Sequence, residues 1–127
     1  EQMIVLDALI ANEDRHWGNF GALRVSESLE FIGLAPVFDN GNSLGYKAAS
    51  VRRNRNADVS VAFNKTHTLE LKHVSSAMKV DWDGIMNHCM EIVEHRYNQL
   101  VEPEFGMDRA HMISQFIQER AKKLKTF

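Results

Sequence analysis

The chain has 127 residues, with 15 Lys or Arg and 17 Asp or Glu, so its formal net charge is −2 when the six His are neutral. This length suits one domain. A hydrophobic content of 44% and a charged content of 25% exclude a disordered chain. The balanced charge gives no general reason to expect a nucleic-acid partner. The single cysteine excludes an internal disulfide. The sequence has no apolar run long enough to span a membrane and no secretory signal, so we expect a soluble protein of the reducing cytoplasm.

The first predicted element is a buried helix over residues 3–12. Eight of the nine residues from 3 to 11 are apolar, and only Asp7 interrupts them. A helix that is apolar on most sides is stable only when it is buried. We therefore expect the chain to be a piece of a longer protein rather than a complete small one. Asp7 should have a buried partner, for which Arg15 is the candidate.

A β-hairpin is predicted next, after a polar loop at residues 12–19. Two short apolar runs, 20–25 and 29–34, are separated by the three residues 26–28. Short apolar runs with a connection of this length are typical of paired antiparallel strands. Pro36 then ends the pattern.

The second half of the chain predicts helices. Residues 69–78 suit a short helix, and 81–101 suit a long one with Asp81 as its N-cap. A last helix is predicted over 109–125, capped by Asp108. The buried stripes of the two long helices should consist of Trp82, Ile85, Met86, Cys89, Val93, Tyr97 and Leu100, and of Ile113, Phe116, Ile117, Arg120 and Leu124. The fold class is therefore mainly α with one small β-hairpin.

A cluster of polar side chains directly follows the first predicted helix. Six of the eight residues from 12 to 19 are polar, and Asp39 follows the hairpin. Because a hairpin returns the chain to its starting point, we expect Asp14, Asn19 and Asp39 to lie close together. Phosphoryl transfer needs an aspartate near the attacking hydroxyl and oxygen ligands for Mg²⁺. The five-residue spacing of Asp14 and Asn19 matches the kinase pattern Asp-x-x-x-x-Asn, although each side chain alone also suits loop capping.

Two motifs resemble the catalytic core of HipA-like serine/threonine kinases. Residues 12–21 (NEDRHWGNFG) and 35–39 (APVFD) are similar to that family's patterns Asn-x-Asp-x-His-x-x-Asn-x-Gly and Ala-Pro-x-x-Asp. The string Asp-Arg-His-x-x-Asn is also similar to the catalytic loop of phosphoinositide kinases. The resemblance implies a protein-kinase-like C-lobe across 1–127. Its catalytic and metal-binding loops would occupy residues 12–43. An irregular stretch in the place of the activation segment would occupy 44–68, and helices would form the remainder, 69–127.

The resemblance also implies roles for individual residues. Asp14 would be the catalytic aspartate, with His16 supporting the loop or contacting the phosphates. Asn19 and Asp39 would bind Mg²⁺ and, through it, ATP. The parent function would be Mg-ATP-dependent phosphoryl transfer to a protein Ser or Thr. The alternatives are a non-catalytic, kinase-derived regulatory or interaction module, and a lipid or small-molecule kinase.

The sequence lacks the other half of a kinase active site. No Gly-rich phosphate loop and no Val-Ala-x-Lys strand occur in it, so we expect the N-lobe to be absent and the isolated chain to be inactive. The expected partners are a protein substrate, the missing N-lobe and, because HipA-like proteins often act in toxin–antitoxin modules, a DNA-binding antitoxin-like protein. The floor of the open cleft should be apolar, which makes self-association a further expectation.

Several other features favour structural explanations. A basic run within residues 44–68 is formed by Lys47, Arg52, Arg53 and Arg55. It suits a solvated loop, with binding of a phosphate, an acidic substrate or nucleic acid as the alternative. His88, Glu91 and His95 lack the spacing of a two-histidine zinc helix. Trp17 is expected to pack against the fold, and Cys89 to be a small buried residue.

Overall fold

A computed structural model of the chain describes residues 1–45, 66–75, 78–100 and 103–126. Its elements in chain order are α1 (Gln2–Ile10), the 3₁₀ helix η1 (Trp17–Asn19), β1 (Ala22–Arg24), β2 (Phe31–Leu34), α3 (His67–Leu71), α4 (Trp82–Leu100) and α5 (Pro103–Leu124). The described fold is therefore mainly helical with one two-stranded antiparallel sheet, as the sequence predicts.

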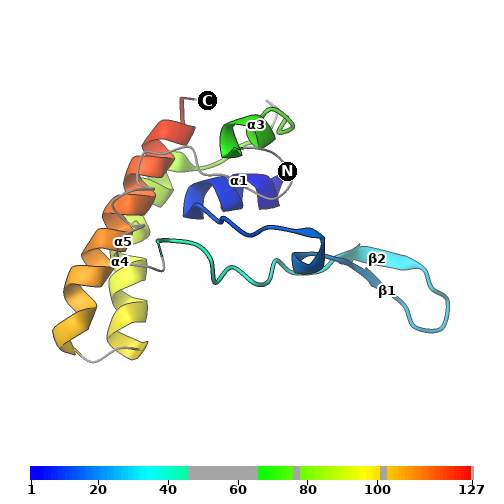
Figure 1. The fold of residues 1–127 in the computed structure, drawn as a ribbon, viewed down its shortest axis with the longest axis horizontal. Helices are drawn as coiled ribbons and strands as arrows, with labels where there is room; N and C mark the ends of the chain where they lie inside the picture. Colours follow the sequence, from blue (N-terminus) through cyan, green and yellow to red (C-terminus); the bar gives the residue numbers. More distant parts are fainter. Residues whose placement is uncertain (46–65, 76–77, 101–102, 127) are drawn as a thin grey trace.

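The helices gather on one side of the molecule and the hairpin projects from the other. Helices α4 and α5 lie side by side, α1 contacts α5, and α3 packs over α1 (Figure 1). The hairpin of β1 and β2 extends away from all of them (Figure 1). The loop that follows α1 and the loop that follows β2 both run between these two regions.

The apolar core forms where α5 meets the end of α1. Phe116 is fully buried and packs with Ala11, while Leu44 and Ile117 cover the same cluster. In α5, Ile113, Phe116, Arg120 and Leu124 are buried as the stripe predicts. Ala11 adopts a left-handed conformation with φ 50°, which ends α1 at Ile10. The helix is thus shorter than the predicted range of 3–12.

The hairpin is confirmed, but its turn is longer than predicted. Val25 N–H donates to the Glu30 carbonyl at 3.0 Å, so the connection comprises the four residues 26–29. Leu29, expected in the second strand, lies in this turn with φ 59°. Its N–H donates to the Val25 carbonyl at 2.9 Å, which closes the turn. Every residue of β1 and β2 is exposed, so the helices give this sheet no cover.

The boundaries of the later helices differ from prediction. α3 begins at His67, inside the stretch 44–68 that was predicted to be irregular, because Thr66 Oγ1 accepts from Leu69 N–H at 3.4 Å and caps a helical turn. It ends at Leu71 rather than at residue 78.

α5 begins at Pro103, well before the predicted start at Arg109. Proline is favoured in a first helical turn, where its missing N–H costs no hydrogen bond. The predicted cap at Asp81 is confirmed, since its Oδ1 accepts from Gly84 N–H at 2.8 Å. The basic run of residues 47–55 and the side chains of Tyr97 and Leu100 lie outside the described part.

Candidate functional site

A buried ion pair anchors the polar loop to α1. The Asp7 and Arg15 side chains are each 1% exposed. Arg15 Nε and Nη2 donate to the two carboxylate oxygens of Asp7, each at 2.9 Å. Asn12 Nδ2 also donates to Asp7 Oδ1, at 3.0 Å. The predicted partnership of Asp7 and Arg15 is confirmed, and its paired geometry is the strongest that a guanidinium and a carboxylate form.

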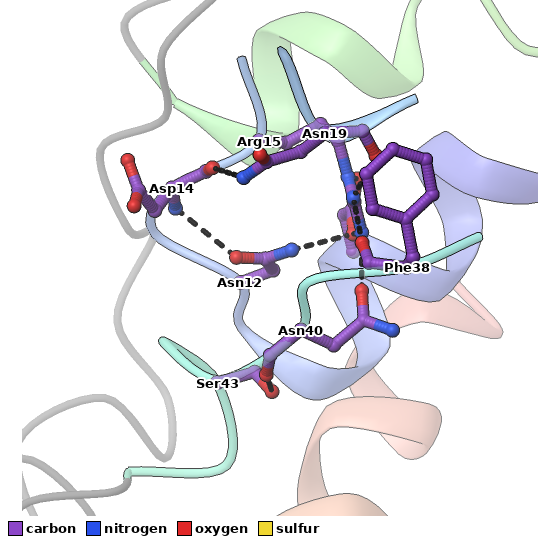
Figure 2. Close-up of polar contacts among 8 residues, drawn as sticks. Asn12, Asp14, Arg15, Asn19, Phe38, Asn40 and Ser43 are labelled. Atoms are coloured by element: carbon purple, nitrogen blue, oxygen red, sulfur yellow. Dashed lines mark hydrogen bonds and ion pairs between the residues drawn. The ribbon is translucent and has the colours of Figure 1, made fainter. Parts of the chain in front are cut away.

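The same arginine joins two loops that are separated by the hairpin. Arg15 Nη1 donates to the Asn19 carbonyl at 2.7 Å and to the Phe38 carbonyl at 2.7 Å. Arg15 Nη2 donates to Asn40 Oδ1 as well. Figure 2 shows these groups approaching the guanidinium from both loops. Because Phe38 and Asn40 flank Asp39, Arg15 holds the backbone carbonyl just before that residue and the side chain just after it.

Asp14 is oriented by neighbours from both loops. Its carboxylate Oδ2 accepts from Asn42 Nδ2 at 2.8 Å, and its N–H donates to Asn12 Oδ1 at 3.1 Å. The backbone adds a further tie, because Glu13 N–H donates to the Asn42 carbonyl at 3.1 Å. Within the described residues Asp14 Oδ1 has no hydrogen-bond donor. The carboxylate is thus held through one oxygen and open at the other.

Asn19 and Asp39 supply the oxygen atoms that were predicted as metal ligands. Asn19 is buried, and its Nδ2 donates to the Asp14 carbonyl at 2.9 Å, which turns its Oδ1 away from that bond. Asp39 is exposed and has a left-handed backbone with φ 53°. Its carboxylate has no hydrogen bond or ion pair with any described residue. One carboxylate and one amide oxygen fit the hard, oxygen-only ligand set of Mg²⁺.

The structure brings the loops that carry these groups together at Arg15. The use of Asn19 and Asp39 as metal ligands, and of Asp14 as a catalytic group, stays a prediction.

His16 has a structural role within the loop. Its exposed ring accepts from Gly18 N–H through Nδ1 at 3.1 Å and caps η1. A Cβ on Gly18 would lie 3.0 Å from the His16 ring, so this close approach suits glycine. A contact of His16 with phosphates stays a prediction. The expectation that Trp17 packs against the fold is wrong, because the side chain is 80% exposed.

The sequence did not indicate two of the residues that complete the site. Asn40 binds Arg15, and Asn42 binds Asp14. Both lie in a turn of the type where asparagine is common for local reasons, so their composition alone does not reveal long-range partners. The signal that was present is the density of amide side chains immediately after Asp39.

A second buried carboxylate lies behind the Asp7–Arg15 pair. Burial of Glu70 in α3 raises its pKa above the ordinary value of 4.5. The negative charge of Asp7 raises this pKa further, whereas His73 lowers it. The raised pKa means that the fold favours the neutral, protonated form of Glu70 beside the Asp7 carboxylate.

Sites of other kinds receive less support. In the described ranges, no three His, Cys, Asp or Glu side chains gather closely enough to hold a metal ion. His88 Nδ1 lies 3.8 Å from Glu91 Oε2 on an exposed face of α4. Cys89 is buried, as predicted, with its Sγ 3.2 Å from Ser114 Oγ. None of the helices in the described residues has the length and hydropathy of a membrane span.

Apolar side chains are exposed along the hairpin and the segment after it. The large ones are Leu23, Leu29, Phe31, Ile32, Leu34, Val37 and Phe38. At the base of the hairpin, a cavity of about 850 Å³ lies between the start of α1 and residues 34–37. That this apolar surface is the floor of a kinase cleft stays a prediction, as does its partner.

Comparison with known proteins gives one informative match. Over 49 residues, or 39% of the chain, the sequence is 49% identical to the serine/threonine-protein kinase CtkA of Helicobacter pylori (strain J99 / ATCC 700824). The match spans 15% of the length of that kinase. No protein-family model and no solved structure matches the chain. The similarity supports a kinase-related family for this chain.

Proposed function

We propose that the chain forms the catalytic C-lobe of a Mg-ATP-dependent phosphotransferase that resembles HipA-like kinases and acts on Ser or Thr of a protein. The observation that carries the proposal is the sharing of Arg15 Nη1 by the Asn19 and Phe38 carbonyls, each at 2.7 Å. These two hydrogen bonds hold the Asp14–Asn19 loop next to the Asp39 loop. The similarity to CtkA supports the same class of reaction.

Asp14 is the residue that handles the proton of the acceptor hydroxyl. Asn42 holds its Oδ2 at 2.8 Å, so the carboxylate keeps one orientation while Oδ1 remains open to the acceptor. In this position Oδ1 would accept the hydroxyl proton as the acceptor oxygen bonds to the γ-phosphorus of ATP, while the bond from that phosphorus to the bridging oxygen breaks and ADP leaves. A positioned acid or base of this kind typically contributes ~10²–10⁴ to the rate.

Asn19 and Asp39 would hold the metal ion. A bound Mg²⁺ neutralises charge on the phosphates of ATP, which is the main electrostatic requirement of phosphoryl transfer. The exposed Asp39 carboxylate suits this role, because no described residue competes for it. The Asn19 amide is fixed by its bond to the Asp14 carbonyl, and Arg15 ties this loop to the Asp39 loop, so both loops have a set geometry before any ligand arrives.

The partner proposals follow from the same function. The exposed hairpin would face the nucleotide-binding lobe, and a protein substrate would approach Asp14 from the open side. We also propose a DNA-binding antitoxin-like partner, a cytoplasmic location and self-association of the chain. The exposed apolar hairpin also favours a second candidate, a non-catalytic module that uses this surface to bind another protein.

The experiment is a labelled-ATP transfer assay on the full-length protein that carries this chain. Asp14→Asn should lower kcat by ~10²–10⁴ and leave the unfolding midpoint unchanged, since Asp14 is only half-buried. Glu91→Gln, on the exposed face of α4, is the matched carboxylate control and should retain wild-type turnover. Wild-type turnover in Asp14→Asn would contradict the catalytic role. Absence of nucleotide binding by the full-length protein would favour the non-catalytic module.

A further inference from the structure

We infer that Arg15 is a positioning residue that builds the metal site by holding Asn19 and Asp39 together without contacting metal, phosphate or substrate. The inference rests on the proposed function, because it assigns a cause to the geometry of that site. It is carried by the contacts of the guanidinium, by the exposure of the segment around Asp39, and by the burial of the Asp7–Arg15 pair.

The guanidinium of Arg15 has no donor left for a ligand. An arginine side chain carries five N–H bonds. The structure supplies one acceptor for each: two from Asp7, and one each from the Asn19 carbonyl, the Phe38 carbonyl and Asn40 Oδ1. An arginine that is saturated in this way and 1% exposed cannot reach a phosphate. Arg15 must therefore act through the two loops and the Asp7 carboxylate that it binds.

The segment that contains Asp39 depends on these bonds for its position. Val37 is 38% exposed and Phe38 is 45% exposed, so burial of apolar side chains does little to hold the segment. Arg15 binds the backbone just before Asp39 and the side chain just after it. Asn42 ties the two loops three residues further on, whereas Arg15 contacts both residues that flank Asp39.

Lysine cannot replace this arrangement. Its ammonium group carries three donors on one atom, whereas the acceptors around Arg15 are spread along a planar fork. Arg15→Lys keeps the charge opposite Asp7 but must release loop acceptors. Substitutions that remove the support of a metal ligand typically weaken metal affinity by about 10–100-fold.

The test measures Mn²⁺ binding to the chain, with Mn²⁺ as the probe for Mg²⁺. Paramagnetic broadening of the amide signals of Asn19 and Asp39 reports binding, and hydrogen exchange reports loop opening. Arg15→Lys should weaken Mn²⁺ binding about 10–100-fold and speed exchange at residues 38–42. Asn40→Ala removes one acceptor while leaving Asp7–Arg15 intact, so it should show the same pattern with a smaller change and remain folded.

Arg120→Lys is the matched control. Arg120 is also a buried arginine, and its Nε donates to the Ala8 carbonyl of α1 at 2.7 Å. Arg120→Lys should lower the unfolding midpoint without a selective change in Mn²⁺ affinity or in hydrogen exchange at residues 38–42. Unchanged Mn²⁺ affinity in both Arg15→Lys and Asn40→Ala, or equal loop exchange in the Arg15 and Arg120 variants, would overturn the inference.

Failure of the proposed function gives a different result. If the wild-type chain shows no broadening with Mn²⁺ alone, the proposed metal site is wrong. The exchange data still decide the role of Arg15 in that case, because selective opening of residues 38–42 in Arg15→Lys requires no metal.

Discussion

The junction around Arg15 and the pair of helices α4 and α5 are held together by different forces. At the junction, one side chain makes directional hydrogen bonds to α1 and to two loops. In the helix pair, α4 and α5 pack through many weak contacts, among them that of the buried Cys89 Sγ with Ser114 Oγ. The comparison teaches that the geometry of the junction depends on a few directional hydrogen bonds, most of them made by Arg15, whereas the stability of the helices is distributed over many contacts.

Loss of the charge partner at the junction should have the largest effect on stability. Asp7→Ala leaves the buried Arg15 guanidinium without its carboxylate, which typically costs about 3–5 kcal/mol. Urea unfolding measures this loss. The matched control is Asp83→Ala, which removes an exposed ion pair with Lys125 at 2.7 Å and should cost about 0–1 kcal/mol. Similar costs for the two variants would show that the junction is not a special point of the fold.

A small change in the helix pair should be tolerated. Ile113→Val removes one methylene from a buried residue and should cost about 0.5–1.5 kcal/mol, because the surrounding contacts are kept. Thermal unfolding checks the cost, and hydrogen exchange at residues 38–42 should be unaffected. Opening of those loops by Ile113→Val would show that the two regions are coupled and would break the comparison.

The smallest expected effect concerns the charge of Glu70 and depends on pH. Burial, and next the charge of Asp7, raise the pKa of Glu70 in the folded state, so the fold binds its proton more tightly than the unfolded chain does. The associated stability is present below pH 4.5 and is lost as the pH rises through the folded-state pKa. Glu70→Gln should therefore stabilise the protein at pH 7, and the gain should fade toward pH 4. A gain that persists at acidic pH would assign the effect to packing instead.

Local patterns predict much of the fold. A nearly continuous apolar run identifies α1, and apolar periodicity identifies the buried face of α5. Asp81 marks the start of α4 through its capping chemistry. The early part of α5 was missed because residues 103–108 include proline and glycine and show no apolar stripe. The turn at Leu29 was missed because an apolar residue with positive φ looks the same in sequence as a strand residue.

Some contacts of the candidate site could be predicted from the sequence and others could not. Pairing of Asp7 with Arg15 could be predicted, because a carboxylate in an apolar helix needs a cation nearby. The partners of Arg15 in the second loop could not, because one is a backbone carbonyl and the other is an asparagine in a turn. Contacts of this kind depend on where the hairpin returns the chain, and residue type does not encode that position.

The exposure of Trp17 gives the chain a built-in optical sensor. The sequence has two tryptophans, Trp17 in η1 between Arg15 and Asn19, and Trp82 at the start of α4. With 80% of its side chain in water, the Trp17 indole should emit at long wavelength in the free chain. A lobe or ligand that covers this loop would shift the emission toward the blue. A single-tryptophan variant, Trp82→Phe, would thus report occupancy of the loop in real time without any added label.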